Sequence, residues 1–144
     1  MNTNTLPATI LAAKEKFELA CKDASALQIV SNFGAAFTAV NVIALLREAM
    51  TDEVMDKVFM PLMNTKIGFL TDRNGRARSG GRAPLPLYTR DIVRDCIIDA
   101  VTIGLLPTGN QFNIIAERMY PTKEGYTSLL RKLGVKYFID TSYD

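Results

Sequence analysis

Two groups of residues in this chain have types and spacings that could do chemistry: a row of aspartates and a cluster of arginines. Asp91, Asp95 and Asp99 recur every four residues. A helix would therefore present them on one face, where carboxylates can bind Mg²⁺. Arg94 and Thr102 would share that face, which is typical of a solvated helix side with local ion pairs. Two interpretations follow, a carboxylate/Mg²⁺ nuclease and an ordinary polar surface, and we predict neither a metal site nor a catalytic residue here.

The rest of the composition also argues against common enzyme chemistry. The chain contains no histidine, which removes the commonest general base and the commonest transition-metal ligand. Cys21 and Cys96 form no C-x-x-C pair, and we expect both to be buried thiols in a reducing compartment. The glycine-rich segment from Gly75 to Arg82 lacks the Lys-Ser/Thr of a phosphate-binding loop. We therefore expect a protein that is not an enzyme and needs no cofactor.

The arginines gather in the middle of the chain. Residues 66–94 hold seven basic and two acidic side chains, a net charge of +5, whereas residues 1–65 carry −2 and residues 95–144 carry −1. Within this stretch, residues 72–86 combine arginine with glycine, serine and proline, which predicts a flexible basic loop. Such a loop either serves solubility or binds a polyanion, because arginine pairs with phosphate and an adjacent aromatic ring can stack on a base. The predicted nucleic-acid contacts are Arg73, Arg76, Arg78, Arg82 and Tyr88.

Helical periodicity predicts the elements that must position these residues. We expect helices over residues 8–24, 32–50 and 90–103, one from Thr51 that Pro61 breaks or kinks, and one from Pro121 to Gly134. Short strands are expected at residues 66–71 and 85–88, flanking the basic loop as a hairpin, and at residues 111–116 and 135–139. The prediction is a single α+β domain over residues 1–144: N-terminal helices, a basic β-hairpin-like loop, then helix-strand-helix-strand around a small antiparallel sheet.

Two helices have more apolar surface than one partner can cover. The helix over residues 32–50 is apolar around much of its circumference, so it is either central or part of a subunit interface. On the helix over residues 90–103, Ile98 falls among the polar positions, which indicates a second surface covered by another subunit or by further chain.

The last predicted helix offers a second basic surface. Its apolar stripe is predicted at Tyr126, Leu129, Leu130 and Leu133. There are two interpretations of the outward residues of this helix and one residue on a neighbouring strand. Together with the free N–H groups near Thr122 they bind phosphates in a row, a phosphate track, or they are simply a solvated basic face. The residues of this track are Arg118, Lys123, Thr127, Arg131 and Lys132.

The N-terminus has neither the basic start nor the apolar run of a signal peptide, and no stretch approaches 18 apolar residues. These features predict a soluble cytoplasmic protein with no membrane contact.

The segment from Ile103 to Gly134 carries a family resemblance. Ala100, Gly104, Leu105 and Pro107 form an alanine-containing helix end with a Gly-Leu-x-Pro break, followed by a strand. A further set completes the pattern: Gly125, Tyr126, Leu129, Lys132 and Gly134. Over about residues 95–140 the chain resembles the RecT/Redβ superfamily of phage single-strand annealing proteins.

The resemblance implies a function and partners. It implies ATP-independent binding and annealing of single-stranded DNA in phage-type homologous recombination, homo-oligomeric rings or filaments, and a phage exonuclease as a possible partner. Two alternatives stay open beside it. One is a non-enzymatic interaction module of a phage or mobile element, in which the basic loop docks an acidic partner. The other is the Mg²⁺-dependent nuclease.

Overall fold

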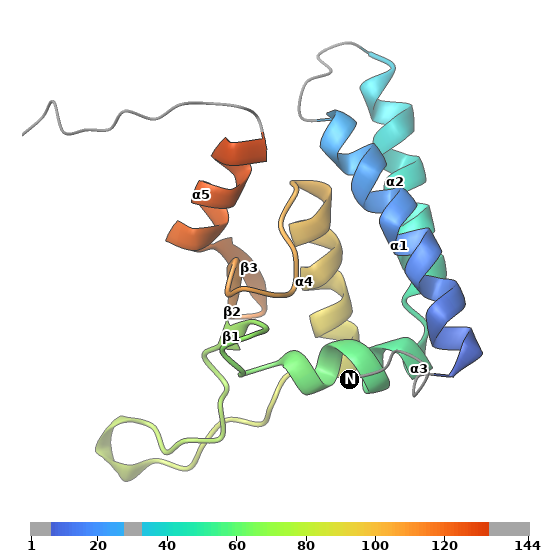
Figure 1. The fold of residues 1–144 in the computed structure, drawn as a ribbon. Helices are drawn as coiled ribbons and strands as arrows, with labels where there is room; N and C mark the ends of the chain where they lie inside the picture. Colours follow the sequence, from blue (N-terminus) through green and yellow to red (C-terminus); the bar gives the residue numbers. More distant parts are fainter. Residues whose placement is uncertain (1–6, 28–32, 133–144) are drawn as a thin grey trace, which may run out of the picture.

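The fold is α+β, as predicted. The computed structural model describes residues 7–27 and 33–132, and within these ranges it has five helices and one three-stranded sheet (Figure 1). The helices are α1 (Ala8–Leu27), α2 (Ala35–Ala49), α3 (Asp52–Val54), α4 (Arg90–Thr102) and α5 (Lys123–Lys132), and the strands are β1 (Leu70–Thr71), β2 (Phe112–Ile115) and β3 (Arg118–Pro121). The strand predicted at residues 135–139 lies outside the described residues. None of the helices described is both long enough and apolar enough to cross a bilayer.

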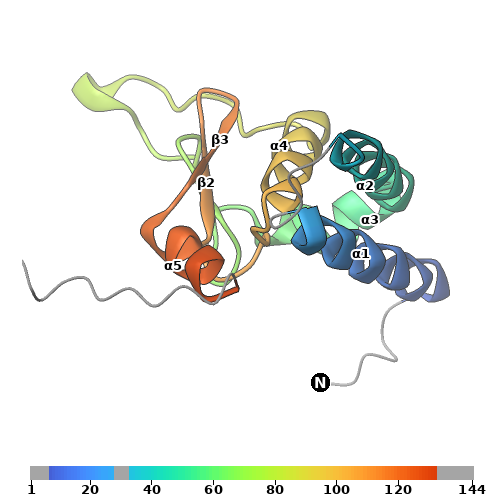
Figure 2. The ribbon, with the colours of Figure 1, turned by 90° about the horizontal axis from the view of Figure 1, so that it is seen from above.

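Helix α4 lies between the paired helices α1 and α2 and the sheet (Figures 1 and 2). Its buried residues point in several directions: Val93, Cys96, Ile97, Ile98, Ala100 and Val101. Ile98 is only 3% exposed, so the second apolar surface of this helix is covered within the chain itself. The prediction that another subunit or further chain covers it was therefore wrong. A single helix thus joins the two halves of the core.

The predicted helix starts are confirmed by their caps. The Thr51 hydroxyl accepts a hydrogen bond from the N–H of Val54, and the Thr89 hydroxyl accepts one from the N–H of Ile92. After α3 the chain continues as a π-helical turn (Met55–Phe59) and a 3-10 turn (Met60–Leu62) that contains Pro61. The third helix is therefore irregular near this proline, as expected for a residue that cannot donate a backbone hydrogen bond.

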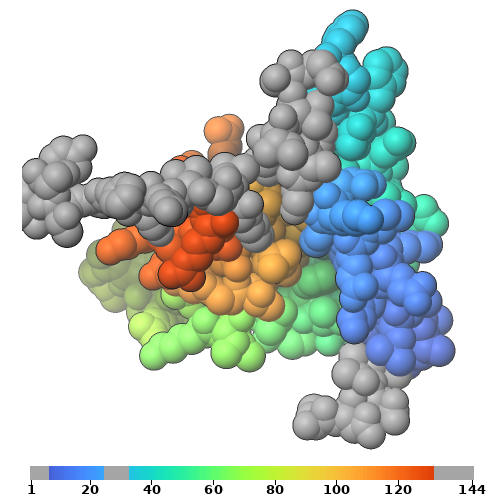
Figure 3. All heavy atoms as spheres, turned by 45° about the horizontal axis from the view of Figure 1, so that its top comes forward, coloured from blue at the N-terminus to red at the C-terminus, as the bar shows by residue number. Residues whose placement is uncertain are grey.

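Helix α2 is peripheral, so the prediction of a central position was wrong. One side of it packs against α1 and α4 through Val42, Leu46 and Ala49. The opposite side is open, with Phe37 73% exposed and Val40 66% exposed. The beginning of α2 (cyan) stands out from the body of the molecule (Figure 3). The apolar side of this helix that contains Phe37 and Val40 therefore has no partner within the described residues.

The sheet is mixed, not antiparallel, and the predicted hairpin around the basic loop is absent. β1 pairs in parallel with β2, and β2 pairs antiparallel with β3. Residues 85–88 form no strand. Pro84 and Pro86 explain this difference, because a proline has no N–H to donate to a strand ladder. The basic loop therefore leaves from β1 and returns to α4 without a supporting strand pair.

The hairpin that does form, β2 to β3, was missed in the sequence. Its two-residue turn is Ala116–Glu117, and both residues have positive φ, 52° and 66°. Turns of this kind favour Asn-Gly or Asp-Gly, so the sequence gives no signal for one. Pro121, expected to open the last helix, is instead the final residue of the edge strand β3, opposite Phe112. The helix begins two residues later, at Lys123.

Two glycines set how closely α5 approaches the rest of the fold. Gly104, at φ 95°, ends α4, and the N–H groups of Gly104 and Leu105 return to the carbonyls of Val101 and Ala100. Gly125 is buried against Gln111, the residue before β2: an added Cβ would lie 2.1 Å from the carbonyl oxygen of Gln111. The Gly-Leu-x-Pro break is thus a helix-ending motif, and α5 is seated on backbone.

Candidate nucleic-acid interface

The tip of the basic loop is a tight turn closed by its own hydrogen bonds. The N–H of Arg78 donates to the carbonyl of Arg82 at 2.9 Å, and the two residues form an antiparallel bridge. Gly80 and Gly81 adopt φ of 76° and 75°, which only glycine adopts without strain. The bridge places two arginines opposite each other at the tip.

Three arginines of this tip have charges that no described carboxylate neutralises. Arg76, Arg78 and Arg82 are exposed, and no ion pair joins them to an acidic side chain in the described part of the chain. Arg78 and Arg82 donate from Nε to the carbonyls of Ala83 and Ser79, at 2.8 and 3.2 Å. Like charges on opposed positions repel, so an anion bound between them would relieve that repulsion.

A buried clamp holds the two ends of the loop together. The Tyr88 hydroxyl donates a hydrogen bond to the carboxylate of Asp72 and accepts one from the N–H of Glu117 at 3.1 Å. The other carboxylate oxygen of Asp72 accepts from the N–H of Ala116 at 3.2 Å. The loop is therefore tied at its base to the β2–β3 turn. Two effects raise the pKa of Tyr88 above its ordinary value: burial, which is the larger, and the hydrogen bond with Asp72.

The clamp changes the role of two predicted contacts. Tyr88 is only 2% exposed, and the guanidinium of Arg73 lies 4.4 Å from the centre of its ring. The ring has no open face for a base, so the structure contradicts the expected stacking on Tyr88. Arg73 is half-buried, and its carbonyl accepts from the side chains of Asn64 and Thr71. Both residues anchor the loop, so of the five contacts predicted here only the tip residues Arg76, Arg78 and Arg82 are exposed.

The second basic surface lies on β3 and α5. Arg118, Lys123 and Arg131 are exposed, and Thr127 is half-buried. The side chain of Lys132 lies outside the described residues. Tyr126 is 57% exposed, so it does not belong to the buried stripe predicted for this helix. Leu129 packs on the core, on the side where Gly125 is buried.

The start of α5 has fewer free backbone donors than predicted. The Thr122 hydroxyl accepts from the N–H of Gly125 at 3.0 Å and donates to the carbonyl of Asn110 at 2.6 Å. The N–H of Thr122 itself donates to the carbonyl of Gln111. The predicted phosphate track would therefore depend on the side chains of this helix more than on its N-terminus.

The two basic surfaces lie on one side of the molecule. In Figures 1 and 2 the basic loop and α5 both lie on the side of α4 that faces away from α1 and α2, at opposite ends of the β2–β3 hairpin. The sheet therefore lies between the two basic surfaces.

The remaining arginines of the basic stretch have structural partners. Arg94 is 16% exposed and binds Asp52 at 2.6 Å, Asp91 at 2.8 Å and the carbonyl of Met50 at 2.9 Å. Arg90 binds Asp56 at 2.7 Å. The net charge of +5 therefore overstates what is available to a ligand.

The three aspartates of α4 have different surroundings and form no common cluster in the described part of the chain. Asp91 pairs with Arg94, and Asp95 pairs with Arg47 at 3.2 Å. Burial, then repulsion from Asp95, raises the pKa of Asp99. In the ranges that the structure describes, no three acidic, cysteine or histidine side chains converge as a metal site would require. Burial also raises the pKa of the Cys96 thiol to about 11, which keeps it protonated and unreactive.

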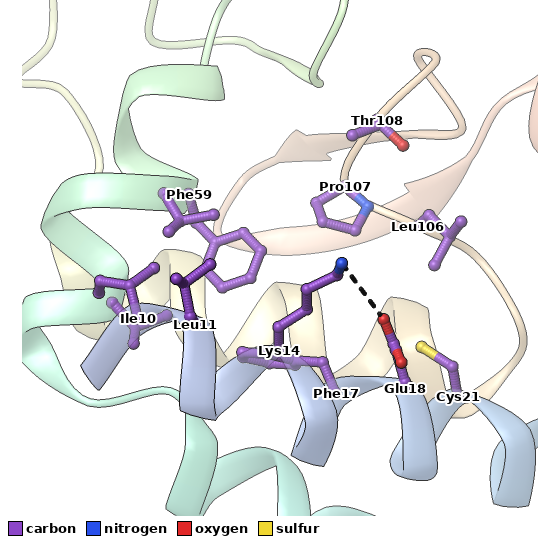
Figure 4. Close-up of a pocket in the computed structure, with 12 residues that line it drawn as sticks. Ile10, Leu11, Lys14, Phe17, Glu18, Cys21, Phe59, Leu106, Pro107 and Thr108 are labelled. Carbon is purple, nitrogen blue, oxygen red and sulfur yellow. Dashed lines mark ion pairs between the residues drawn. The ribbon is translucent and has the colours of Figure 1, made fainter. Parts of the chain in front are cut away.

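An apolar pocket lies on the other side of α4, between α1, the turns after α3 and the loop before β2 (Figure 4). Its volume is about 680 Å³, within the range of ligand pockets. Phe17 and Phe59 pack edge to face on one wall, and Pro107 faces them. The Lys14–Glu18 pair, 3.7 Å apart, is its main polar feature. None of the predicted nucleic-acid contacts lines it.

No model of a known protein family, no curated protein and no solved structure matches this chain. The resemblance to the RecT/Redβ superfamily therefore stays a prediction.

Proposed function

We propose that this protein binds single-stranded DNA and anneals complementary strands without ATP, in phage-type homologous recombination. The observation that carries the proposal is the loop tip, where Arg76, Arg78 and Arg82 are exposed without a described acidic partner. The basic residues of β3 and α5 on the same side support it. Contacts of this kind bind phosphates and leave bases free to pair, so binding depends on salt and little on sequence.

The decisive experiment measures binding and annealing together. Fluorescent single-stranded oligonucleotides are titrated at several salt concentrations in the presence of a chelator, and annealing of complementary strands is followed without nucleotide. Replacing Arg76, Arg78 and Arg82 by alanine removes three phosphate contacts. The slope of log K against log[salt] should then become shallower by about 2, because each contact on a single strand contributes about 0.7.

A matched control removes the same charge from the other side of the molecule. Lys14, Lys22 and Lys57 are exposed on α1 and the turn after α3, and their replacement by alanine should leave the slope unchanged. If both triple variants lose the same affinity, binding follows net charge alone, and the loop is not the site. No binding at low salt would rule out the proposed function.

We also propose that the exposed stripe of α2 mediates self-association into rings or filaments. Phe37 and Val40 form an apolar surface without a partner in the described residues, and such surfaces mark interaction sites. Light scattering should show large particles for the wild type and small ones for Phe37→Lys or Val40→Lys. Asn41→Lys adds the same charge on an exposed polar position of the same helix and should have no effect.

A protein-interaction module is the second candidate, and the apolar pocket of α1 favours it. A groove of this size lined by aromatic rings suits an apolar side chain or helix of a protein partner. A phage exonuclease would be one such partner. In either case neither Cys21 nor Cys96 is in a disulfide, in keeping with a cytoplasmic location. Binding of a partner that survives high salt and the loss of all three tip arginines would favour the module.

A further inference from the structure

The outward face of the sheet presents an aromatic ring beside a guanidinium. Tyr120 of β3 lies opposite Asn113 of β2, and Arg118 lies opposite Ile115. Residues paired across two strands point to the same face, so these four side chains share one surface, which Leu70 of β1 extends.

This face is exposed at Tyr120 and Ile115 and partly covered at Asn113, whose amide oxygen is buried, whereas the opposite face is core. Tyr120 is 47% exposed and Ile115 is 44% exposed, while Phe112 and Ile114, which alternate with them, are fully buried. Among the described residues, no ion pair engages Arg118, and no hydrogen bond engages the Tyr120 hydroxyl. A half-exposed aromatic ring and a charged group without a described ion pair therefore lie on the same face of β3.

We propose that Tyr120 stacks on a base of the bound single strand while Arg118 contacts an adjacent phosphate. The proposal rests on the proposed function and adds to it a base-contacting position. Side chains two residues apart on a strand lie about 7 Å from each other, on the same face. Stacking on an aromatic ring tolerates any base, because every base has a π face, so it adds affinity without sequence preference.

Charge favours nucleic acid over a peptide as the occupant. β3 is an edge strand, and such an edge can also accept an added peptide strand. The exposed basic side chains on this side of the molecule, however, outnumber the exposed acidic ones: Arg76, Arg78, Arg82, Arg118, Lys123 and Arg131 against Asp72, Glu117 and Glu124. A polyanion can contact both cationic surfaces while it crosses the sheet, whereas a peptide would need many acidic residues to do so.

The test compares oligonucleotides with and without bases. Tyr120→Ala should weaken binding of a dT oligonucleotide about 5- to 150-fold, the range that loss of one stacked base gives. Tyr120→Phe keeps the ring and should stay within about twofold of the wild type. An abasic oligonucleotide of equal length should bind the wild type and Tyr120→Ala equally. Tyr126→Ala is the matched control, since Tyr126 is similarly exposed but lies on α5.

A second measurement reports the contact directly. The chain contains no tryptophan, so Tyr120→Trp places a single indole on the sheet face. Its fluorescence should be quenched by the dT oligonucleotide, with saturation at the concentration where a labelled oligonucleotide is fully bound.

The outcomes separate this inference from the proposed function. Salt-dependent binding with no quench, or with equal loss for the abasic strand, would leave the proposed function standing and refute base stacking. Quenching by unstructured peptides but not by oligonucleotides would assign the face to strand addition and overturn the inference. Absence of any oligonucleotide binding would refute both.

Discussion

Replacing Gly125 by alanine should destabilise the protein, although the same change stabilises most helices. In a helix interior this substitution normally gains about 1 kcal/mol, which is an upper limit here because Gly125 is the third residue of α5. Here the new Cβ would lie 2.1 Å from the carbonyl oxygen of Gln111 and 3.1 Å from a methyl group of Leu105. A carbon and a carbonyl oxygen approach to about 3.3 Å, so α5 or β2 must move by about 1 Å.

The magnitude follows from these two opposing effects. Overpacking costs about 1–3 kcal/mol, and the upper end applies because the obstacle is backbone, which cannot rotate away. With the helix gain subtracted, the net loss is about 2 kcal/mol. For a chain of this size that lowers the Tm by about 6 °C.

Urea unfolding followed by circular dichroism would measure the change, and a lower midpoint with an unchanged slope would assign it to the native state. Ser128→Ala, on the same helix at a half-buried position, is the control and should change stability by less than about 0.5 kcal/mol. A Gly125→Ala variant as stable as the wild type would show that α5 does not rest on the Gln111 carbonyl.

The other predictions concern the loop clamp and the arginine that joins α3 to α4. Tyr88→Phe leaves Asp72 and the Glu117 N–H without their shared hydroxyl, so stability should fall by about 1–2 kcal/mol, and trypsin should cut the basic loop faster. Because the pKa of Tyr88 is raised on folding, the contribution of this hydroxyl to stability is complete below pH 10 and is lost as the pH rises through the raised pKa. Thermal unfolding above pH 10 should show this loss of stability in the wild type and not in Tyr88→Phe. Arg94→Met should lower stability at neutral pH. Since Arg94 holds the pKa of Asp52 below 3.8, that stabilisation is present above pH 3.8 and disappears as the pH falls through the lowered value, so an acid titration of the variant should lack this part of the loss.

Features written in local chemistry could be predicted from the sequence, and features that depend on distant partners could not. Thr51 and Thr89 cap their helices through residues three positions away, so the sequence alone identifies both starts. The clamp joins Tyr88 to Asp72 across 16 residues and to the turn at Glu117, and no spacing rule indicates such a contact. For that reason Tyr88 was predicted as a stacking surface and proved to be an anchor.

The sheet face was missed for a related reason. The turn at Ala116 and Glu117 has the backbone conformation of a tight hairpin but not the Asn-Gly or Asp-Gly sequence typical of one, so β3 could not be recognised. If β3 is not recognised, the sequence does not show that Arg118 and Tyr120 lie on one face of a strand and Met119 on the other. Tyr120 is then only a residue before a proline. Tertiary structure decides which of these side chains faces solvent.

The position of α4 has a consequence for how the two halves of the molecule communicate. One side of α4 packs on α1 and α2, and another side packs on β2 and β3. Unfolding of either half would therefore expose buried residues of α4 to water. A ligand that binds only the native form stabilises the whole cooperative unit by RT ln(1 + [L]/Kd). If an oligonucleotide binds at the basic loop as proposed, it should therefore slow amide hydrogen exchange in α1 and α2, on the far side of α4, without any change in their structure.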